Sequence, residues 1–297
     1  MTYRLKFFIP LFFLLFLVSF PAEAKIEKRM IAGTEVEWDG RSIIEPDSEL
    51  DIGSLSFADF DDSNHAGLGL FSTKYSSQTE RYNLGDGESW DTEVWHIHGD
   101  LEGPTVYIVS GTHGNERAGW YAGELLVNST LKAGELFILP KANRQGTDNR
   151  SRYVSNNMDL NRSYPGSHDG NEAQILANAI FSDIKKVNPD IVLDLHEAII
   201  YSPGERDFLG STFIFTDLEG MEDLFMDMLF ATQDGSLCNN EYGYNGPGPK
   251  GSLNREVTDL LGIPTITIET FRGFDIIRRV SDQLQVVQFV LQYLNMR

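Results

Sequence analysis

The chain has 297 residues, a length that fits one large or two small globular domains and can bury a substantial core. Its net charge of -20 argues against nucleic acid as a partner. The single cysteine, Cys238, excludes an internal disulfide and any zinc site built from several cysteines. Any metal site in this chain must therefore use histidine and carboxylate ligands.

The N-terminal residues have the organisation of a secretory signal peptide. Two basic residues precede an apolar run from Phe7 to Phe20, and Ala22–Ala24 offers a small-x-small cleavage site. The apolar run is shorter than the ~20 residues needed to span a bilayer, which favours a cleaved leader (residues 1–24) over a retained membrane anchor. We therefore expect a mature protein that begins near Lys25, lies in a periplasm or outside the cell, and is not stably inserted in a membrane.

Residues 25–100 are polar and lack long helical periodicity, which predicts a small strand-rich N-terminal extension. Its clearest strand is Asp91–His98, whose second half alternates between polar and apolar residues. His96 and His98 then share one face of the strand. Two histidines at this spacing can bind a metal, but the sequence places no carboxylate or third histidine on that face, so we favour a structural role.

From residue 101 to residue 297 the sequence changes to short apolar runs separated by helical stretches, as expected for one catalytic domain. The apolar runs are rich in β-branched or aromatic residues and predict buried strands at Thr105–Ser110, Glu135–Leu139, Ile191–Leu195, Thr212–Phe215 and Thr265–Ile268. Helices are predicted at Glu116–Val127, Glu172–Val187, Met221–Ala231 and Ile276–Leu294. This alternation predicts an α/β fold with a mixed, largely parallel central sheet flanked by helices.

Three polar side chains follow predicted strands, at the edge where α/β sheets bind ligands. His113 follows the first strand, His196 directly follows the third, and Glu269 directly follows the last. Glu116 enters a helix one turn after His113. Catalytic zinc takes three protein ligands and keeps one position open for water, and two histidines with one glutamate form an established set. His113, Glu116 and His196 are therefore candidate ligands for one Zn2+.

A cluster of arginine and asparagine side chains lies between the two metal-ligand segments. Its members are Arg150, Arg152, Asn161 and Arg162, in a stretch that is predicted to be loop. Such side chains can hold a substrate carboxylate through paired hydrogen bonds, a task suited to the planar guanidinium. On charge alone, the simpler explanation for these arginines is ion pairing with an acidic surface. The choice between this role and substrate binding therefore depends on the neighbouring motifs.

Four ordered motifs resemble the zinc carboxypeptidase superfamily and, within it, are most similar to the aspartoacylase and succinylglutamate desuccinylase branch. The motifs are Gly111–Glu116, Arg152-Tyr153 followed by Asp159–Arg162, Asp194–Glu197 and Thr267–Glu269. The similarity extends in the same order from about Gly103 to the C-terminus. The preceding region resembles the small N-terminal extension of bacterial members.

The resemblance implies a role for each matching position. The three candidate ligands would bind Zn2+, and Glu269 would be the general base. Asn161 and Arg162 would hold the substrate carboxylate, while Arg152 would polarise the scissile carbonyl. These roles suit the chemistry, because zinc lowers the pKa of bound water toward ~7 and an adjacent carboxylate can take the proton.

Two positions stay open between alternatives. The stretch between the arginine and asparagine motifs is longer than in the short acylase pattern, so Arg150 competes with Arg152 for the carbonyl. The family often places a tyrosine before a Gly-Ser pair, here Gly251–Ser252. We prefer Tyr244 to Tyr242 as that substrate-binding residue.

The resemblance implies an exported zinc metallohydrolase that cleaves an amide bond in a small-molecule or short-peptide substrate with a free carboxylate. Export favours a carboxypeptidase acting on short peptides, whereas the sequence branch favours a deacylase of N-acyl amino acids. Two alternatives are an esterase with the same site and an exported metal- or peptide-binding protein without turnover. Because all three ligands and Glu269 are present, a loss of turnover is disfavoured.

Overall fold

The computed structural model describes residues 27–31, 34–38, 43–44, 75, 77–199, 210–216, 220–238 and 242–297. The predicted leader and its cleavage site lie outside these residues, so export stays a prediction. Within the described part of the chain, no helix combines the length and the apolar character needed to cross a membrane.

The strands of the predicted N-terminal extension divide between two sheets. The first three form a separate antiparallel sheet of β1 (Glu27–Ile31), β2 (Thr34–Trp38) and β3 (Ile43–Ile44). The next two, β4 (Gln78–Leu84) and β5 (Thr92–His98), pair with each other, and β5 also pairs with a strand of the main sheet. The end of the extension is therefore part of the same sheet as the residues that follow it.

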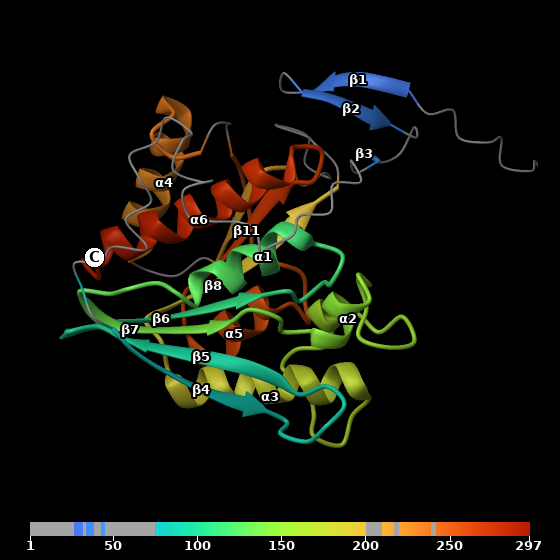
Figure 1. The fold of residues 1–297 in the computed structure, drawn as a ribbon, viewed down its shortest axis with the longest axis vertical. Helices are drawn as coiled ribbons and strands as arrows, with labels where there is room; N and C mark the ends of the chain where they lie inside the picture. The colour runs from blue at the N-terminus through green and yellow to red at the C-terminus, as the bar shows by residue number, and fades with distance from the viewer. Residues whose placement is uncertain are drawn as a thin grey trace, which may run out of the picture.

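The main sheet has eight strands in the order β10-β9-β11-β8-β6-β7-β5-β4 (Figure 1). Its other six strands are β6 (Leu101–Ser110), β7 (Ala133–Leu139), β8 (Ile191–Ala198), β9 (Thr212–Phe215), β10 (Gly243–Asn245) and β11 (Thr265–Phe271). The four central strands β11, β8, β6 and β7 run parallel, while β9, β5 and β4 each make an antiparallel pair with a neighbour. The sheet is mixed and mostly parallel, which confirms the predicted fold class.

Helices cover both faces of this sheet (Figure 1). One face packs against α1 (Arg117–Leu126), α4 (Glu222–Asp234) and α6 (Ile276–Tyr293), and the other against α3 (Glu172–Val187) and α5 (Leu253–Leu261). A short helix, α2 (Arg144–Asp148), follows β7. Because side chains alternate along a strand, Tyr107 of β6 enters one apolar core and Ile108 the other.

The central strand β8 determines where a site can form. Every residue of β8 is buried, as expected for a parallel strand with helices on both faces. Parallel strands end at the same edge, so the carboxyl ends of β6, β8 and β11 meet.

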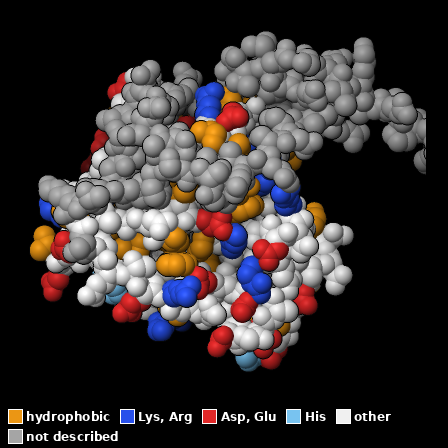
Figure 2. Space-filling view, in the orientation of Figure 1, with side chains coloured by type: hydrophobic (Ala, Val, Ile, Leu, Met, Phe, Trp, Pro, Cys, Tyr) orange, Lys and Arg blue, Asp and Glu red, His pale blue; other side chains and the backbone are white. Residues whose placement is uncertain are grey.

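On the face in Figure 2, the described acidic and basic side chains are interspersed, and no single-sign patch dominates it.

Candidate metal centre and active site

His113, Glu116 and His196 come together at this carboxyl edge of the sheet. One ligand atom from each lies within 4.8 Å of the others, and all three residues are buried. The Glu116 carboxylate lies between the two imidazoles, 2.7 Å from Nδ1 of His113 and 2.8 Å from Nδ1 of His196. Two imidazole nitrogens and one carboxylate that converge from a rigid scaffold fit the donor set of a catalytic zinc ion.

The turn that carries two of these residues is held by close backbone contacts. The Glu116 amide donates to the His113 carbonyl at 3.1 Å, so both side chains leave one tight turn before α1. A Cβ on Gly114 would lie 1.9 Å from the carbonyl carbon of Gly146, so only glycine lets this turn approach α2. The Trp120 indole then donates to the Gly114 carbonyl at 3.1 Å.

The second imidazole is held through the backbone of β8 and its neighbours. Gln283 of α6 donates to the His196 carbonyl at 2.7 Å. The next residue, Glu197, accepts a hydrogen bond from the Ala118 amide at 3.0 Å and forms a buried ion pair with Arg279 of α6. These contacts fix the end of β8 between α1 and α6.

Each histidine also faces an outer carboxylate. Nε2 of His113 lies 2.9 Å from Oδ1 of Asp159, and Nε2 of His196 lies 3.0 Å from Oδ1 of Asp194. Such carboxylates orient a ligating imidazole and raise its basicity, which supports metal binding through the opposite nitrogen. Both aspartates lie within the sequence motifs, but those motifs imply no role for them. The spacing in the sequence could have identified Asp194. Residues two positions apart on a strand lie on the same face, so Asp194 shares a face with His196.

The charges of these groups depend on one another because the groups are buried side by side. Burial alone would raise the pKa of Glu116, but His113 and His196 lower it well below the usual range of a glutamate. Burial alone would lower the pKa of His196, but Asp194 and Glu116 raise it well above the usual range of a histidine. The carboxylates therefore favour positive charge at this position, which a bound divalent cation would supply in place of protons.

Glu269 lies on β11 beside this cluster, in register with His196 of β8. Both line a cavity of about 260 Å³. Burial is the main reason that the pKa of Glu269 is raised to about 7, with Glu116 adding to the effect and the two histidines opposing it. A carboxyl group with a pKa near neutrality can both accept and return a proton at physiological pH.

The structure distinguishes the two competing arginines. Arg152 lines the cavity, and its Nη1 lies 3.2 Å from Oε1 of Glu116. Its Nη2 lies 3.0 Å from Oδ2 of Asp159, which fixes the guanidinium beside the metal ligands. Arg150 is not among the described residues that line this cavity.

Asn161 and Arg162 line the same cavity. Oδ1 of Asn161 accepts a hydrogen bond from the Leu253 amide at 2.9 Å, which ties this loop to the start of α5. Gly251 has a φ of +80°, and a Cβ there would lie 2.5 Å from the Arg162 carbonyl oxygen. The loop can therefore approach α5 only because position 251 is glycine.

The two candidate tyrosines are not brought to the cavity. Tyr244 is 57% exposed, and its ring contacts those of Phe215 and Phe225. Tyr242 is buried and stacks on Phe213 with ring centroids 4.4 Å apart. Neither belongs to the described residues that line the site, so a substrate-binding role for Tyr244 has no support from this geometry.

Several solved structures share this fold. A succinylglutamate desuccinylase from Silicibacter sp. TM1040 is 18% identical with a TM-score of 0.57, over 75% of this chain and 71% of that one. The ectoine utilization protein EutE from Ruegeria pomeroyi is 20% identical with a TM-score of 0.56 over the same shares. The cell shape determinant protein Csd4 from Helicobacter pylori is 20% identical with a TM-score of 0.58, over 75% of this chain and 55% of that one. The chain therefore shares the fold of these proteins.

Two sequence comparisons find similarity to one group of proteins. Residues 102–204 match the succinylglutamate desuccinylase/aspartoacylase catalytic domain. Over 100 residues the chain is 36% identical to the N-alpha-acetyl-L-2,4-diaminobutyric acid deacetylase of Halomonas elongata, a match that covers 32% of this chain and 29% of that protein. This part of the chain is similar to the catalytic domain of the succinylglutamate desuccinylase/aspartoacylase branch, which confirms the predicted resemblance.

We predict that the loss of a ligating histidine abolishes Zn2+ binding at this site, whereas the loss of an outer carboxylate only weakens it. His113→Ala or His196→Ala should remove one bound Zn2+ per chain, whereas Asp159→Asn should retain it with about 10- to 100-fold lower affinity. Metal analysis after dialysis against buffered Zn2+ measures both effects. His168→Gln is the matched control, because that histidine is 81% exposed and pairs only locally with Asp169. Unchanged Zn2+ affinity in either alanine variant would refute the ligand assignment.

Proposed function

We propose that the protein is a zinc-dependent hydrolase that cleaves an amide bond in a small substrate with a free carboxylate. The observation that carries this proposal is the convergence of a three-ligand donor set, Glu269 and Arg152 on one cavity. When bound at His113, Glu116 and His196, Zn2+ would supply Lewis acidity and lower the pKa of a coordinated water toward ~7. An ester of the same shape is a second possible substrate, since it would meet the same groups.

The protein's own residues would hold the substrate at both ends. Arg162 and Asn161 would bind its carboxylate, because a guanidinium and an amide together offer several donors in a fixed geometry. Arg152 would donate to the scissile carbonyl oxygen and stabilise the negative charge that develops there. The ion pairs of Arg152 with Glu116 and Asp159 preorganise its guanidinium, so little reorganisation is needed in the transition state.

Glu269 would move the proton. As a carboxylate it would take a proton from the attacking water, and as a carboxylic acid it would return that proton to the leaving amine nitrogen. The amide C–N bond breaks in this second step, giving a free carboxylate and a free amine. Without a bound ion, burial raises the pKa of Glu269 to about 7, so this carboxyl group can exchange a proton near neutral pH.

An N-acyl amino acid is the substrate class we favour. The related protein from Halomonas elongata is named a deacetylase of an N-acetylated amino acid, and the matching domain belongs to acyl-removing enzymes. A cavity of about 260 Å³ suits a ligand of that size. A carboxypeptidase acting on short peptides is the second candidate. It is supported by the fold similarity to Csd4, which is described as a D,L-carboxypeptidase, and by the expected export.

We predict that Glu269→Gln lowers kcat by at least ~10²-fold while Zn2+ stays bound, because the amide keeps the shape of the base but cannot take the proton. Initial rates on N-acyl amino acids, C-terminally free peptides and matched esters, together with metal content, measure this effect and rank the substrate classes. Zn2+ binding without turnover of the whole panel by the wild type would favour a binding protein over an enzyme.

We predict that Arg152→Gln lowers kcat by ~10²- to 10³-fold, as expected when an oxyanion donor is lost. Arg150→Gln is its matched control and should leave kcat near the wild-type value, since Arg150 is not among the described lining residues. The reverse ranking of the two variants in steady-state kinetics would transfer the oxyanion role to Arg150.

We also propose that the protein is exported, on the basis of the leader in its sequence. N-terminal sequencing of protein from the periplasm or medium should give a chain that starts near Lys25. Ala24→Arg, which removes one small residue of the cleavage site, should slow this processing. Recovery of an intact chain from the membrane fraction would instead support a retained anchor.

A further inference from the structure

A second group of metal-binding side chains lies on the edge strands of the sheet. His96 and His98 share one face of β5, as the alternation along a strand requires. The neighbouring strands add carboxylates to this face, because Glu80 of β4 is paired with His96 and Glu135 of β7 is paired with His98. The strand register thus supplies the carboxylates that the sequence did not place beside these histidines.

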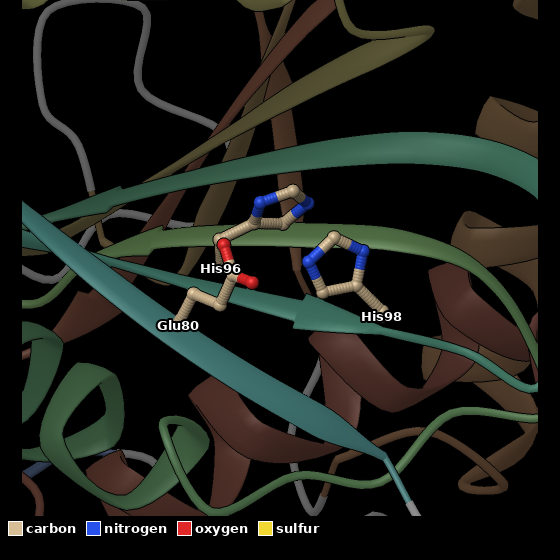
Figure 3. Close-up of side chains that lie close together, drawn as sticks. All are labelled: Glu80, His96 and His98. Atoms are coloured by element: carbon tan, nitrogen blue, oxygen red, sulfur yellow. The ribbon is translucent and has the colours of Figure 1, made fainter.

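Three of these side chains converge closely enough to bind one ion. Ligand atoms of Glu80, His96 and His98 all lie within 4.8 Å of one another. Figure 3 shows the Glu80 carboxylate directed at the two imidazole rings, with one nitrogen of each ring on the side of this carboxylate. The ring centroids of the two histidines are 3.8 Å apart and their planes are tilted by 42°.

Glu135 and Phe137 orient these rings. Oε2 of Glu135 lies 3.2 Å from Nε2 of His96, and its Oε1 lies 3.9 Å from Nδ1 of His98. Glu135 therefore contacts one nitrogen of each ring, which leaves Nδ1 of His96 and Nε2 of His98 for a ligand on the Glu80 side. The His96 ring also stacks on Phe137, with centroids 3.8 Å apart. This arrangement repeats the outer-carboxylate support seen at the first site.

The position of this cluster makes it separate from the active site and open to solvent. Because β5 runs antiparallel to β7, His98 lies at the amino edge of the parallel strands, opposite to the edge that carries the catalytic cluster. The His96 and His98 side chains are 15% and 32% exposed, so an ion can reach both. A cavity of about 570 Å³ adjoins the cluster, and Asp100 and Glu102 line it. These carboxylates favour a cation there.

We propose that Glu80, His96 and His98 form a second metal site that binds a divalent transition-metal ion such as Zn2+. Two imidazoles with one carboxylate suit Zn2+ and its transition-metal neighbours, whereas Mg2+ and Ca2+ prefer sites made of oxygen alone. The remaining coordination positions face solvent and take water.

Metal stoichiometry of the full chain tests this site. After dialysis against buffered Zn2+, elemental analysis should find two ions per chain in the wild type and in the control His168→Gln. His98→Gln should bind one ion with unchanged hydrolytic turnover. Glu80→Gln, a change at an exposed position, should weaken the second site about tenfold or more without affecting folding.

The outcomes separate this site from the catalytic one. If the wild type and His98→Gln each bind one ion and His113→Ala binds none, the second site does not exist. If the wild type binds one ion, His98→Gln none and His113→Ala one, the edge site stands and the proposed catalytic centre fails. If Zn2+ binding at the edge is unchanged in both His98→Gln and Glu80→Gln, the ligand assignment is overturned.

Discussion

The structure depends most on one buried carboxylate, that of Glu116. A buried charge is stable only when partners compensate for its lost hydration. Glu116 obtains them from the turn after β6, from His196 on β8 and from Arg152 in the loop after α2. The backbone amide of Glu197 adds a fourth contact at 3.1 Å. Three segments far apart in sequence must therefore meet at one point, and the parallel centre of the sheet is what allows them to meet.

The charged residues around Glu116 are also paired with groups of opposite charge. Asp159 balances both His113 and Arg152, and the buried pair of Glu197 and Arg279 locks β8 to α6. Glu269 has no such partner of opposite charge at hydrogen-bond distance among the described side chains, so burial raises its pKa to about 7. Stability is thus given up at the group that we propose exchanges a proton, and kept at the groups that hold the site together. This division is typical of active sites.

The sequence predicted the centre of the fold better than its margins. Thr212–Phe215 and Glu172–Val187 have the predicted bounds, because a short β-branched or aromatic run and a long amphipathic stretch are strong local signals. The helix α5 was not predicted: it is only nine residues long and includes three charged side chains, although its apolar residues recur at helical spacing. The separation of β4 and β5 from β1 to β3 was not predicted either. Which sheet a strand joins is decided by the partner it meets, and local sequence carries no signal for that partner.

For the site, the sequence by itself determined the residue types, their order and their places at strand ends, because these are local properties. It predicted that His113, Glu116, His196 and Glu269 would lie at one edge, and the structure brings them there. Only the tertiary structure decided which arginine faces the cavity, which carboxylates stand behind the histidines, and that Glu80 lies opposite His96. Those choices depend on loop path and strand register, which long-range packing fixes and no local pattern encodes.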